Sequence, residues 1–347
     1  MSYLIPPDHR FETAYLPGLR REIAPAADAA ALLHIFRRLR RFRPAIVHTH
    51  MAKAGSLGRL AALLYNAAAG PRRARVVHTY HGHVLEGYFS TLSAGAFSAA
   101  ERFLARRSDA LLAVSPRVRR DLVETHAVGS ADRFRVVPLG FDLEPFAAIG
   151  PEARRAARDR LALPDGARVV AFVGRLTAIK QPDLFLKAAA RVAAAEPRAQ
   201  FLVAGGGDLE AALRAAAGEL GLAGRVRFLG WQRDIAAIYA ASDVVAITSR
   251  NEGTPVALIE GMAAAVPAVC FAVGGVPDVI AGPELGVLIE PGHVEALAGA
   301  IGDLLRRDEE RAVMAGRARA HALDHYGVGR LVRDVDSLYR ELLGRGS

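Results

Sequence analysis

The chain has 347 residues, of which 52% are hydrophobic and 23% charged. This balance excludes a disordered chain, and the length is sufficient for two domains of ordinary size. The single cysteine, Cys270, excludes a disulfide framework and a cysteine metal site, and it indicates a reducing compartment. The start lacks the pattern of a signal peptide, and the most apolar window, 256–276, contains Glu260 and Pro267. We therefore expect a soluble, cytoplasmic protein.

The excess of positive over negative residues lies entirely in the first part of the chain. Residues 1–150 contain 21 Lys and Arg against 12 Asp and Glu, whereas residues 151–347 contain 24 of each kind. This change in composition favours a domain boundary near Gly150. We expect no nucleic-acid partner, because neither interleaved aromatic residues nor a recognition motif accompanies the charge.

The densest positive stretch is residues 34–43, with five arginines, no acid and apolar residues at roughly helical spacing. A basic amphipathic helix of this kind suits an anionic membrane surface or an anionic acceptor. A simply solvated helix face is the alternative.

Strand and helix patterns alternate along the first part, as in an α/β domain with a parallel sheet. A helix is expected over 56–68, and the strand at 75–80 ends at His81, Gly82 and His83. The expected strands are a weak one at 14–16 and clearer ones at 45–49, 75–80, 110–114 and 134–138. Such a domain normally opens on a strand and a phosphate-facing turn, and no such opening precedes residue 45. We therefore expect the first βαβ unit to be missing, either because the start codon is assigned too far downstream or because the chain is a fragment.

The second part follows the same pattern more completely. Strands are expected at 168–173, 199–204, 226–229, 243–248, 268–272 and 286–289, and most of them run into small or glycine-rich turns. This pattern is typical of a doubly wound, Rossmann-like domain, whose ligands lie beyond the carboxyl ends of the strands. We expect an N-terminal domain over 1–150, a C-terminal domain over 151–325, and a final helix over 326–347 that crosses back to the first domain.

The segment 249–263 is the most informative for function. Thr254 is a good helix N-cap and Pro255 suits the first turn, so the helix should point its free N–H groups at the preceding loop, where a phosphate can bind. Glu252 lies in that loop. Glu260 lies on the helix, whose other residues are almost all apolar, so it should have a partner or a ligand. Two carboxylates placed in this way can bind sugar hydroxyls, and a surface loop followed by a helix with one solvated acid is the alternative.

A second, cationic segment follows the strand at 168–173. Arg175 and Lys180 stand just after this strand, at the edge of the sheet where ligands bind. A guanidinium and an ammonium fixed there suit a diphosphate, and they would stabilise a diphosphate that leaves with developing charge. Surface cations in salt bridges are the alternative.

Together these motifs resemble the family 4 retaining glycosyltransferases, which have the two-Rossmann GT-B fold. In the second part the resemblance is carried by Glu252-x7-Glu260, Gly174-Arg175-Leu176-x3-Lys180 and Gly274-Gly275-Val276-Pro277-Asp278. In the first part it is carried by residues 113–122 and 136–142, and residues 48–59 and 78–83 are similar to the sub-group that builds bacterial surface polysaccharide. The resemblance covers the chain from about residue 45 to its end. It implies an α/β fold of two Rossmann-like domains that face a cleft, the first of them incomplete at its N-terminus.

The resemblance also implies roles for individual residues. Catalytic residues would be Arg175 and Lys180 on the diphosphate, Glu252 on the hydroxyls of the donor sugar, and His81 near that sugar and the acceptor. Substrate-binding residues would be Glu260 on the ribose, the backbone N–H groups of Thr254 and Val256 on the diphosphate, Trp231 and Gln232 beside the nucleobase, and Gly174 and Gly253 in the adjoining loops.

The implied reaction moves a hexose from a UDP- or GDP-sugar to a glycan or lipid-linked acceptor, with retention of anomeric configuration, in cell-surface polysaccharide synthesis. It needs no metal or other cofactor, because cationic side chains and a helix end balance the charge of the leaving group. The sequence offers only weak metal patterns, at His48-x-His50 and Asp334-x-Asp336. With a lipid-linked acceptor, the protein would be peripheral on the inner face of the membrane. Two other interpretations stay open: a nucleotide-sugar epimerase of the same fold, and a truncated, inactive chain that acts as a basic membrane-binding or partner-binding module.

Overall fold

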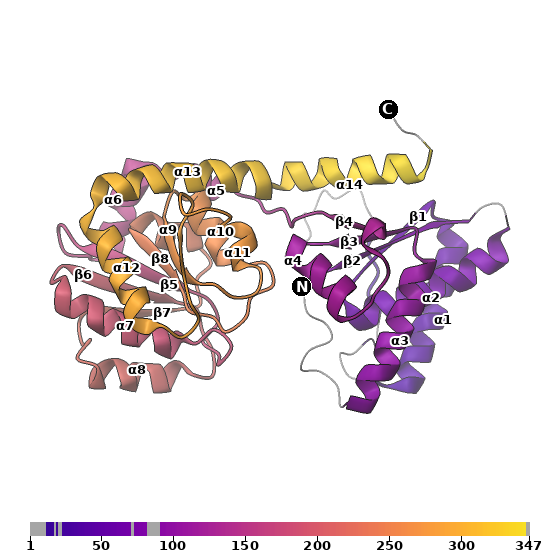
Figure 1. Ribbon diagram of the computed structural model, residues 1–347, viewed down its shortest axis with the longest axis horizontal. Coiled ribbons are helices and arrows are strands. Elements are labelled where there is room, and N and C mark those ends of the chain that lie inside the picture. The colour runs from indigo at the N-terminus through magenta and orange to yellow at the C-terminus, as the bar shows by residue number, and fades with distance from the viewer. Residues whose placement is uncertain (1–11, 17–18, 20–22, 71–72, 82–90, 345–347) are drawn as a thin grey trace.

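The computed structural model describes residues 12–16, 19, 23–70, 73–81 and 91–344. These residues form two lobes, each built on a parallel sheet, and a long helical segment near the C-terminus lies across both lobes (Figure 1). The two-domain α/β architecture that the sequence predicts is therefore confirmed. Among the described helices, none combines the length and the apolar surface that a membrane span requires.

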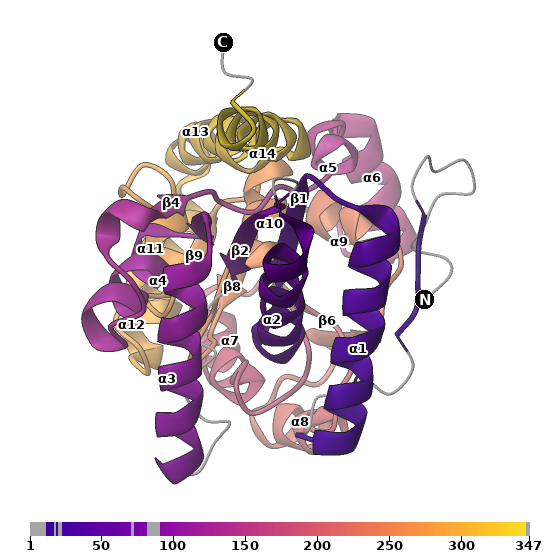
Figure 2. The same ribbon diagram turned by 90° about the vertical axis from the view of Figure 1, so that its right-hand side faces the viewer.

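Within the described residues, the first lobe has a four-stranded parallel sheet of order β1-β2-β3-β4. Its strands are β1 (Ile46–His50), β2 (Arg75–Tyr80), β3 (Ala110–Ala113) and β4 (Phe134–Val136), and its helices are α1 (Pro25–Phe42), α2 (Ala52–Ala69), α3 (Thr91–Arg107) and α4 (Pro116–Arg120). A π-helical turn (Asp121–Thr125) and a 3-10 turn (Ala131–Arg133) follow α4. Figure 2 shows α1, α2 and α3 side by side at the outer end of this lobe.

The weak strand predicted at 14–16 is wrong. Residues 12–16 have no regular secondary structure. The apolar run is only three residues long and ends before Pro17, which lacks the N–H group that a strand ladder needs. The predicted basic helix is present, but it begins earlier than its charged stretch, at Pro25, whose fixed φ suits the first helical position.

Two glycines let α2 lie close to the first sheet. A Cβ atom on Gly55 would meet Cε1 of His78 at 2.4 Å, and one on Gly58 would meet Cγ2 of Thr49 at 2.8 Å. Both distances are too short for a side chain, so the helix can sit here only because these residues are glycine. The N-terminal half of α2 therefore packs directly over β1 and β2, the strands that carry His48, His50 and His78.

Within the described residues, the second lobe has a six-stranded parallel sheet of order β10-β9-β8-β5-β6-β7. Its strands are β5 (Arg168–Val173), β6 (Ala199–Ala204), β7 (Val226–Gly230), β8 (Val244–Ile247), β9 (Ala268–Phe271) and β10 (Val287–Ile289). Its helices are α5 (Glu144–Ala147), α6 (Pro151–Arg160), α7 (Pro182–Ala195), α8 (Glu210–Glu219), α9 (Ile235–Ala241), α10 (Val256–Ala263), α11 (Val276–Val279) and α12 (Val294–Arg306). Each strand occupies its predicted segment to within a residue or two at either end.

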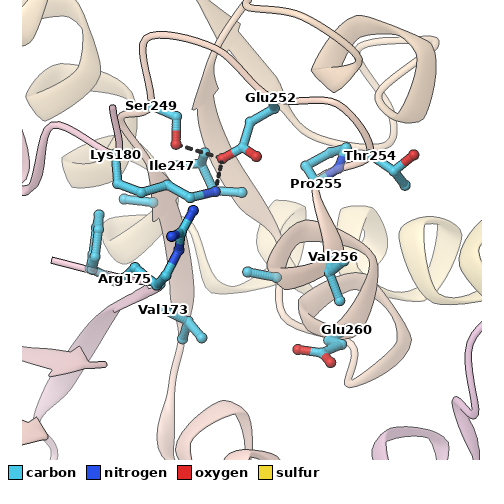
Figure 3. A pocket seen from close by; sticks show the side chains of 14 residues that line it. Val173, Arg175, Lys180, Ile247, Ser249, Glu252, Thr254, Pro255, Val256 and Glu260 are labelled. Carbon is cyan, nitrogen blue, oxygen red and sulfur yellow. Dashed lines mark hydrogen bonds and ion pairs between the residues drawn. The ribbon is translucent and has the colours of Figure 1, made fainter. Parts of the chain in front are cut away.

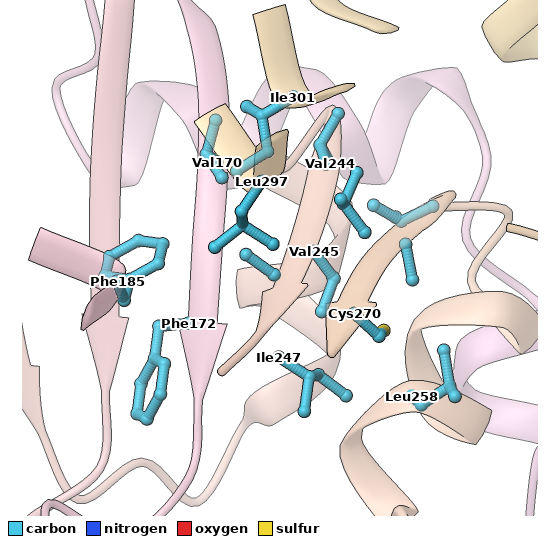
Figure 4. Packing of buried hydrophobic residues seen from close by; sticks show 14 of the residues in the cluster. Val170, Phe172, Phe185, Val244, Val245, Ile247, Leu258, Cys270, Leu297 and Ile301 are labelled. Carbon is cyan, nitrogen blue, oxygen red and sulfur yellow. The ribbon is translucent and has the colours of Figure 1, made fainter. Parts of the chain in front are cut away.

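Both faces of the second sheet are buried, which explains why its strands read as continuous apolar runs. Val170 and Phe172 of β5 point to one face, where they belong to the same apolar cluster as Phe185 of α7 (Figure 4). Val169 of the same strand points to the opposite face, where it packs in a cluster with Ile238 of α9. Helices therefore cover the sheet on both sides, and its strand ends are left to form a site.

The last two helices join the lobes. In Figure 1, α13 (Asp308–Tyr326) lies along the second lobe and α14 (Val328–Leu342) lies along the first. Leu338 of α14 is buried in a cluster with Val77 and Leu112 of the first sheet. The C-terminal helix thus completes the core of the lobe that begins the chain.

Within residues 91–344 the chain passes between the lobes twice, and backbone hydrogen bonds join the two connecting segments. The N–H group of Phe141 donates to the carbonyl of Tyr326 at 2.8 Å, and the N–H group of Val328 donates to the carbonyl of Phe141 at 2.9 Å. Leu143 and Phe146 already belong to the core of the second lobe, so the chain enters that lobe ahead of Gly150. The domain limits 1–150, 151–325 and 326–347 stay a prediction.

A buried ion pair joins α2 to α3. Nη2 of Arg59 donates to both carboxylate oxygens of Glu101, at 2.6 and 2.8 Å, and the two side chains are 1% and 4% exposed. The hydroxyl groups of Ser56 and Tyr80 also donate to Glu101, at 2.8 and 3.1 Å. Removal of either charge would leave the other one buried and uncompensated.

We expect Glu101→Gln to lower the free energy of unfolding by about 3–5 kcal/mol, because it leaves the Arg59 guanidinium buried without its counter-charge. Urea unfolding followed by circular dichroism measures the loss. The double variant Arg59→Met/Glu101→Met is the control, since it removes both charges together and should recover much of the stability. A double variant as unstable as the sum of the two single variants would contradict this account.

Candidate functional site

The strand order of the second sheet reverses between β5 and β8. The chain proceeds outward from β5 to β6 and β7 on one side, and from β8 to β9 and β10 on the other. The loops that follow β5 and β8 therefore diverge and leave a crevice, which is the usual ligand site of such sheets.

A pocket of about 310 Å³ lies at this reversal. It is lined by Phe172, Val173, Gly174, Arg175, Lys180, Ala246, Ile247, Ser249, Glu252, Thr254, Pro255, Val256, Ala257 and Glu260. Seven of the predicted site residues are thus brought together: Gly174, Arg175, Lys180, Glu252, Thr254, Val256 and Glu260.

Lys180 and Glu252 meet at one side of the pocket (Figure 3). Nζ of Lys180 lies 2.6 Å from Oε1 of Glu252, and the hydroxyl of Ser249 donates to the same oxygen at 2.5 Å. The Lys180 side chain is 24% exposed and that of Glu252 is 10% exposed, so the pair is partly shielded from water and is stronger for it. Arg175 points to the same side of the pocket, which therefore carries two cations and one acid.

Hydrogen bonds join the two loops that carry this ion pair. The buried hydroxyl of Thr248 donates to the carbonyls of Lys180 and Gln181, at 3.1 and 2.9 Å. The N–H group of Arg250 donates to the carbonyl of Ile179 at 2.8 Å. These bonds hold the loops at a fixed separation, so the side chains above them face one another without further adjustment.

Gly274 and Gly275 support the Glu252 loop from behind. A Cβ atom on Gly274 would meet the carbonyl oxygen of Glu252 at 1.9 Å, and one on Gly275 would meet the carbonyl oxygen of Gly253 at 1.9 Å. The N–H group of Gly275 donates to the carbonyl of Glu252 at 2.8 Å. The glycine pair of the sequence motif therefore positions the acid by close backbone contact.

Glu260 stands on α10 at another side of the pocket (Figure 3). The hydroxyl of Tyr239, a fully buried residue of α9, donates to Oε2 of Glu260 at 3.0 Å. Burial raises the pKa of Glu260, and the hydrogen bond from Tyr239 partly opposes that rise. Burial and the nearby Glu260 raise the pKa of Tyr239 well above its usual range, so the phenol keeps its proton and donates. Tyr239 is the partner that an acid on this apolar helix requires.

The prediction that Thr254 caps α10 is wrong. The helix begins at Val256 and its N-cap is Pro255, whose ψ of 87° lies outside the helical range. Thr254 stands one residue too early for its hydroxyl to serve the first turn. Thr254, Pro255 and Val256 nevertheless all line the pocket, so the positive end of the helix faces it.

Trp231 and Gln232 lie outside the pocket lining. They follow β7, at the edge of the second sheet, and Trp231 is 75% exposed. Nε2 of Gln232 donates to the carbonyl of Leu229 at 2.5 Å, within its own turn. Both residues therefore stay a prediction as neighbours of the nucleobase, beyond the residues that line the charged pocket.

His81 and Gly253 also lie outside the pocket lining, but they lie close to each other. A Cβ atom on Gly253 would meet the carbonyl oxygen of His81 at 3.3 Å. Because His81 directly follows β2 of the first lobe, this contact brings the predicted histidine to the loop that carries Glu252. Gly82 and His83 lie outside the described residues.

Sequence reasoning missed Tyr239, Thr248 and Ser249. Tyr239 precedes Glu260 by 21 residues and lies on a different helix, so no local pattern connects the two. Thr248 ends a predicted strand and Ser249 follows it, where a hydroxyl that bonds to another loop gives no signal in the sequence.

The weak metal patterns have other partners in the structure. Asp334 pairs with Arg330 at 2.8 Å and Asp336 pairs with Arg340 at 2.7 Å, along α14. In the part of the chain that the structure describes, no three His, Cys, Asp or Glu side chains are grouped as metal ligands would be.

Comparisons with known proteins agree on one family. The family described as "Glycosyl transferases group 1" matches residues 153–321, and that described as "Glycosyltransferase Family 4" matches residues 6–145. The chain is 31% identical over 320 residues to the D-inositol 3-phosphate glycosyltransferase of Corynebacterium aurimucosum. The match covers 88% of this chain and 74% of that relative.

Two crystal structures of Anabaena HepE have a similar fold. The complex with UDP has a TM-score of 0.80 and the complex with UDP-glucose has one of 0.76, both at 22% sequence identity. The matches cover 90% and 92% of this chain, and 82% and 84% of the HepE chains. The GT-B fold expected from the sequence is confirmed.

We expect Glu260→Gln to raise the free energy of unfolding at neutral pH. Burial raises the pKa of Glu260 in the folded state, so the folded protein loses stability as the pH rises above the ordinary carboxyl value of 4.5 and the group ionises. Glutamine keeps the shape and can still accept the hydrogen bond from Tyr239. Urea unfolding measured across pH should show the gain growing above pH 4.5 and levelling off once the folded-state pKa is passed.

Glu295→Gln is the control of opposite sign. A backbone hydrogen bond and the charge of Arg191 lower the pKa of the exposed Glu295, so its stabilising effect is present at neutral pH and is lost on acidification. Parallel pH trends for the two variants would contradict the assignment of Glu260 as an acid that destabilises the fold.

Proposed function

Because the chain belongs to the group 1 glycosyltransferase family, we propose that it transfers a sugar from a nucleotide-diphosphate sugar to an acceptor. The observation that carries this proposal is the gathering of Arg175, Lys180, Glu252 and Glu260 in one pocket, where the strand order of the second sheet reverses. The similar HepE structures contain UDP and UDP-glucose, which supports a uridine diphosphate sugar as the donor. A guanosine diphosphate sugar is the alternative.

The cations of the pocket bind the diphosphate. Arg175 offers a planar fork, and the ammonium group of Lys180 has three donors, so its pairing with Glu252 still allows it to bind a phosphate oxygen. The N-terminal end of α10 with the N–H group of Val256, and the N–H group of Thr254 in the loop before it, add positive potential. Negative charge develops on the diphosphate as its bond to the sugar breaks, so these groups stabilise the transition state more than the ground state.

The carboxylates bind hydroxyl groups. Glu260, oriented by Tyr239, binds the ribose, and Glu252, held by Lys180 and Ser249, binds the donor sugar. The remaining predicted residues complete the site, with His81 beside the donor sugar from the first lobe, Trp231 and Gln232 beside the nucleobase, and Gly174 and Gly253 in the loops next to the donor.

The transferred sugar is a hexose, and the reaction retains the anomeric configuration, as the resemblance to the retaining family implies. It proceeds without a metal ion or other cofactor, because two side-chain cations and a helix end supply the positive charge that a metal would otherwise bring.

The acceptor is a glycan or a lipid-linked intermediate of cell-surface polysaccharide synthesis, used at the inner face of the membrane. Support comes from α1, which exposes the arginines of residues 37–43 together with Phe42, itself 75% exposed. Exposed cations next to an exposed aromatic ring suit an anionic lipid surface.

Substitution of Arg175, Lys180 or Glu252 by alanine should lower sugar transfer by roughly 10²–10³-fold, the usual effect of removing a group that stabilises developing charge. A nucleotide-sugar panel read by thermal shift selects the donor, because a ligand of the folded state raises the melting temperature. Release of the nucleotide diphosphate then measures transfer. Lys187→Ala is the matched control, since Lys187 is 52% exposed on α7 and pairs only loosely with Asp183, at 3.7 Å.

Unchanged transfer in all three variants would refute the site, provided that their melting temperatures match that of the wild type. Epimerised donor with no glycosylated product would favour the epimerase. Donor binding without turnover would favour the inactive binding module. Loss of transfer on adding a chelator, restored by a divalent metal, would refute the metal-independent mechanism.

Flotation with liposomes tests the membrane contact. The protein should float with phosphatidylglycerol liposomes and stay at the bottom with phosphatidylcholine liposomes, and the fourfold variant Arg37→Gln/Arg38→Gln/Arg40→Gln/Arg41→Gln should lose flotation. Each basic residue near the surface contributes about 1 kcal/mol, and raised salt should weaken the binding of the wild type. If the variant floated as well as the wild type, the membrane contact would have to be made by another part of the chain than α1.

A further inference from the structure

Histidines gather where β1 and β2 end, on the side of the first lobe that meets the Glu252 loop. His78 is buried beneath α2, and its Nδ1 lies 2.8 Å from the hydroxyl of Thr49. The other three, His48, His50 and His81, form a row from Tyr339 of α14 to the loop that carries Glu252.

His48 is fixed at one end of this row. Its Nδ1 lies 2.6 Å from the hydroxyl of Tyr339 on α14, and its Nε2 lies 2.7 Å from the hydroxyl of Thr79 on β2. Both ring nitrogens therefore have hydroxyl partners, and the ring cannot turn without breaking two hydrogen bonds.

His50 connects this fixed ring to His81. The rings of His48 and His50 are stacked, with centroids 4.4 Å apart and planes 28° apart. Nδ1 of His50 lies 2.9 Å from Nε2 of His81. In a hydrogen bond between two neutral imidazoles one nitrogen donates and the other accepts, so the tautomer of each ring fixes that of the other.

The backbone directly after His50 is strained. Met51 has φ 67° and ψ 164°, a region that residues other than glycine rarely adopt and that costs about 1–3 kcal/mol. This residue turns the chain from β1 into α2, which Gly55 and Gly58 seat against the sheet. The surrounding packing thus maintains a backbone conformation next to His50, whose ring contacts His81.

We infer that His50 is a positioning residue that holds the ring orientation and the tautomer of His81 where the two lobes meet. The inference rests on the proposed function, in which His81 approaches the donor sugar. His50 acts through His81, and Tyr339, Thr79 and His48 support it in turn.

The titratable groups around the pair favour the neutral state that this role requires. Burial lowers the pKa of His50, and burial together with the charge of His50 lowers that of His81. Burial and then the charges of His50 and His81 lower the pKa of His48 to about 4. The pKa of His78 is lowered by burial and then by Arg59 and the other histidines, and burial raises the pKa of Tyr339. At neutral pH the row is therefore uncharged, and its hydrogen bonds depend on tautomers.

Three substitutions at His50 test the inference. Asparagine places an amide near the position of the imidazole Nδ1, glutamine places one near the position of Nε2, and leucine removes both. Long-range nitrogen–proton NMR of ¹⁵N-histidine protein reports the tautomer of His81, whose signals are identified by their loss in His81→Asn. We expect one tautomer in the wild type and in His50→Asn, and a mixture in His50→Leu and His50→Gln.

Transfer kinetics give the second readout. His50→Leu should lower kcat by roughly tenfold to hundredfold, the usual effect of a misplaced reacting group, and His50→Asn should recover most of that loss. KM for the donor should change less than twofold in every variant, because the donor pocket lies in the other lobe.

An unchanged His81 tautomer in His50→Leu, or an asparagine variant no better than the glutamine variant in either readout, would overturn the inference. If leucine unfolds the protein, the comparison of asparagine with glutamine decides, since both are polar and only asparagine reaches the Nδ1 position. The NMR readout requires no turnover. A His81 tautomer that responds to His50 in a protein that transfers no sugar would therefore refute the proposed function and leave the positioning role standing.

Discussion

The ion pair between Lys180 and Glu252 depends on the reversal of strand order between β5 and β8. Parallel strands bring their carboxyl ends to one edge of the sheet, and only at the reversal do two neighbouring loops leave that edge in opposite directions. The bonds from Thr248 to the Lys180 loop and the close contacts of Gly274 then fix these loops. The charges of the pocket are consequently set by backbone geometry before any ligand is bound, which is the arrangement that electrostatic stabilisation requires.

Both lobes contain unfavourable local features close to the groups proposed to act on the substrate. Glu260 is an acid on an apolar helix, and burial raises its pKa. Met51 has a backbone conformation suited to glycine. Such conflicts are destabilising on their own, and they persist because the packing around them permits no alternative. One lies beside the donor pocket and the other beside the histidine row. A sequence selected for stability alone would have other residues at these two positions.

Much of the fold could be predicted from the sequence because its strands are short apolar runs that end in glycine or polar turns. The gathering of Arg175, Lys180, Glu252 and Glu260 could be expected for the same reason, since each follows a strand of one parallel sheet. Partners distant in the sequence could not be predicted. The bond from Tyr239 to Glu260 depends on how α9 lies beside α10, and the contact between His50 and His81 depends on the register of β1 and β2. Thr254 failed as a cap because the helix starts one residue later than its composition suggests.

The placement of α14 has a consequence for biosynthesis. Val77, Leu112 and Val137 of the first lobe pack in one cluster with α14, a helix that leaves the ribosome only after the whole second lobe. The usual order, in which the N-terminal domain of a nascent chain folds first, therefore cannot run to completion here. The second lobe can close its core while the first still exposes one apolar sheet face. Until α14 emerges, that face is the surface on which a chaperone, or another unfolded chain, would bind.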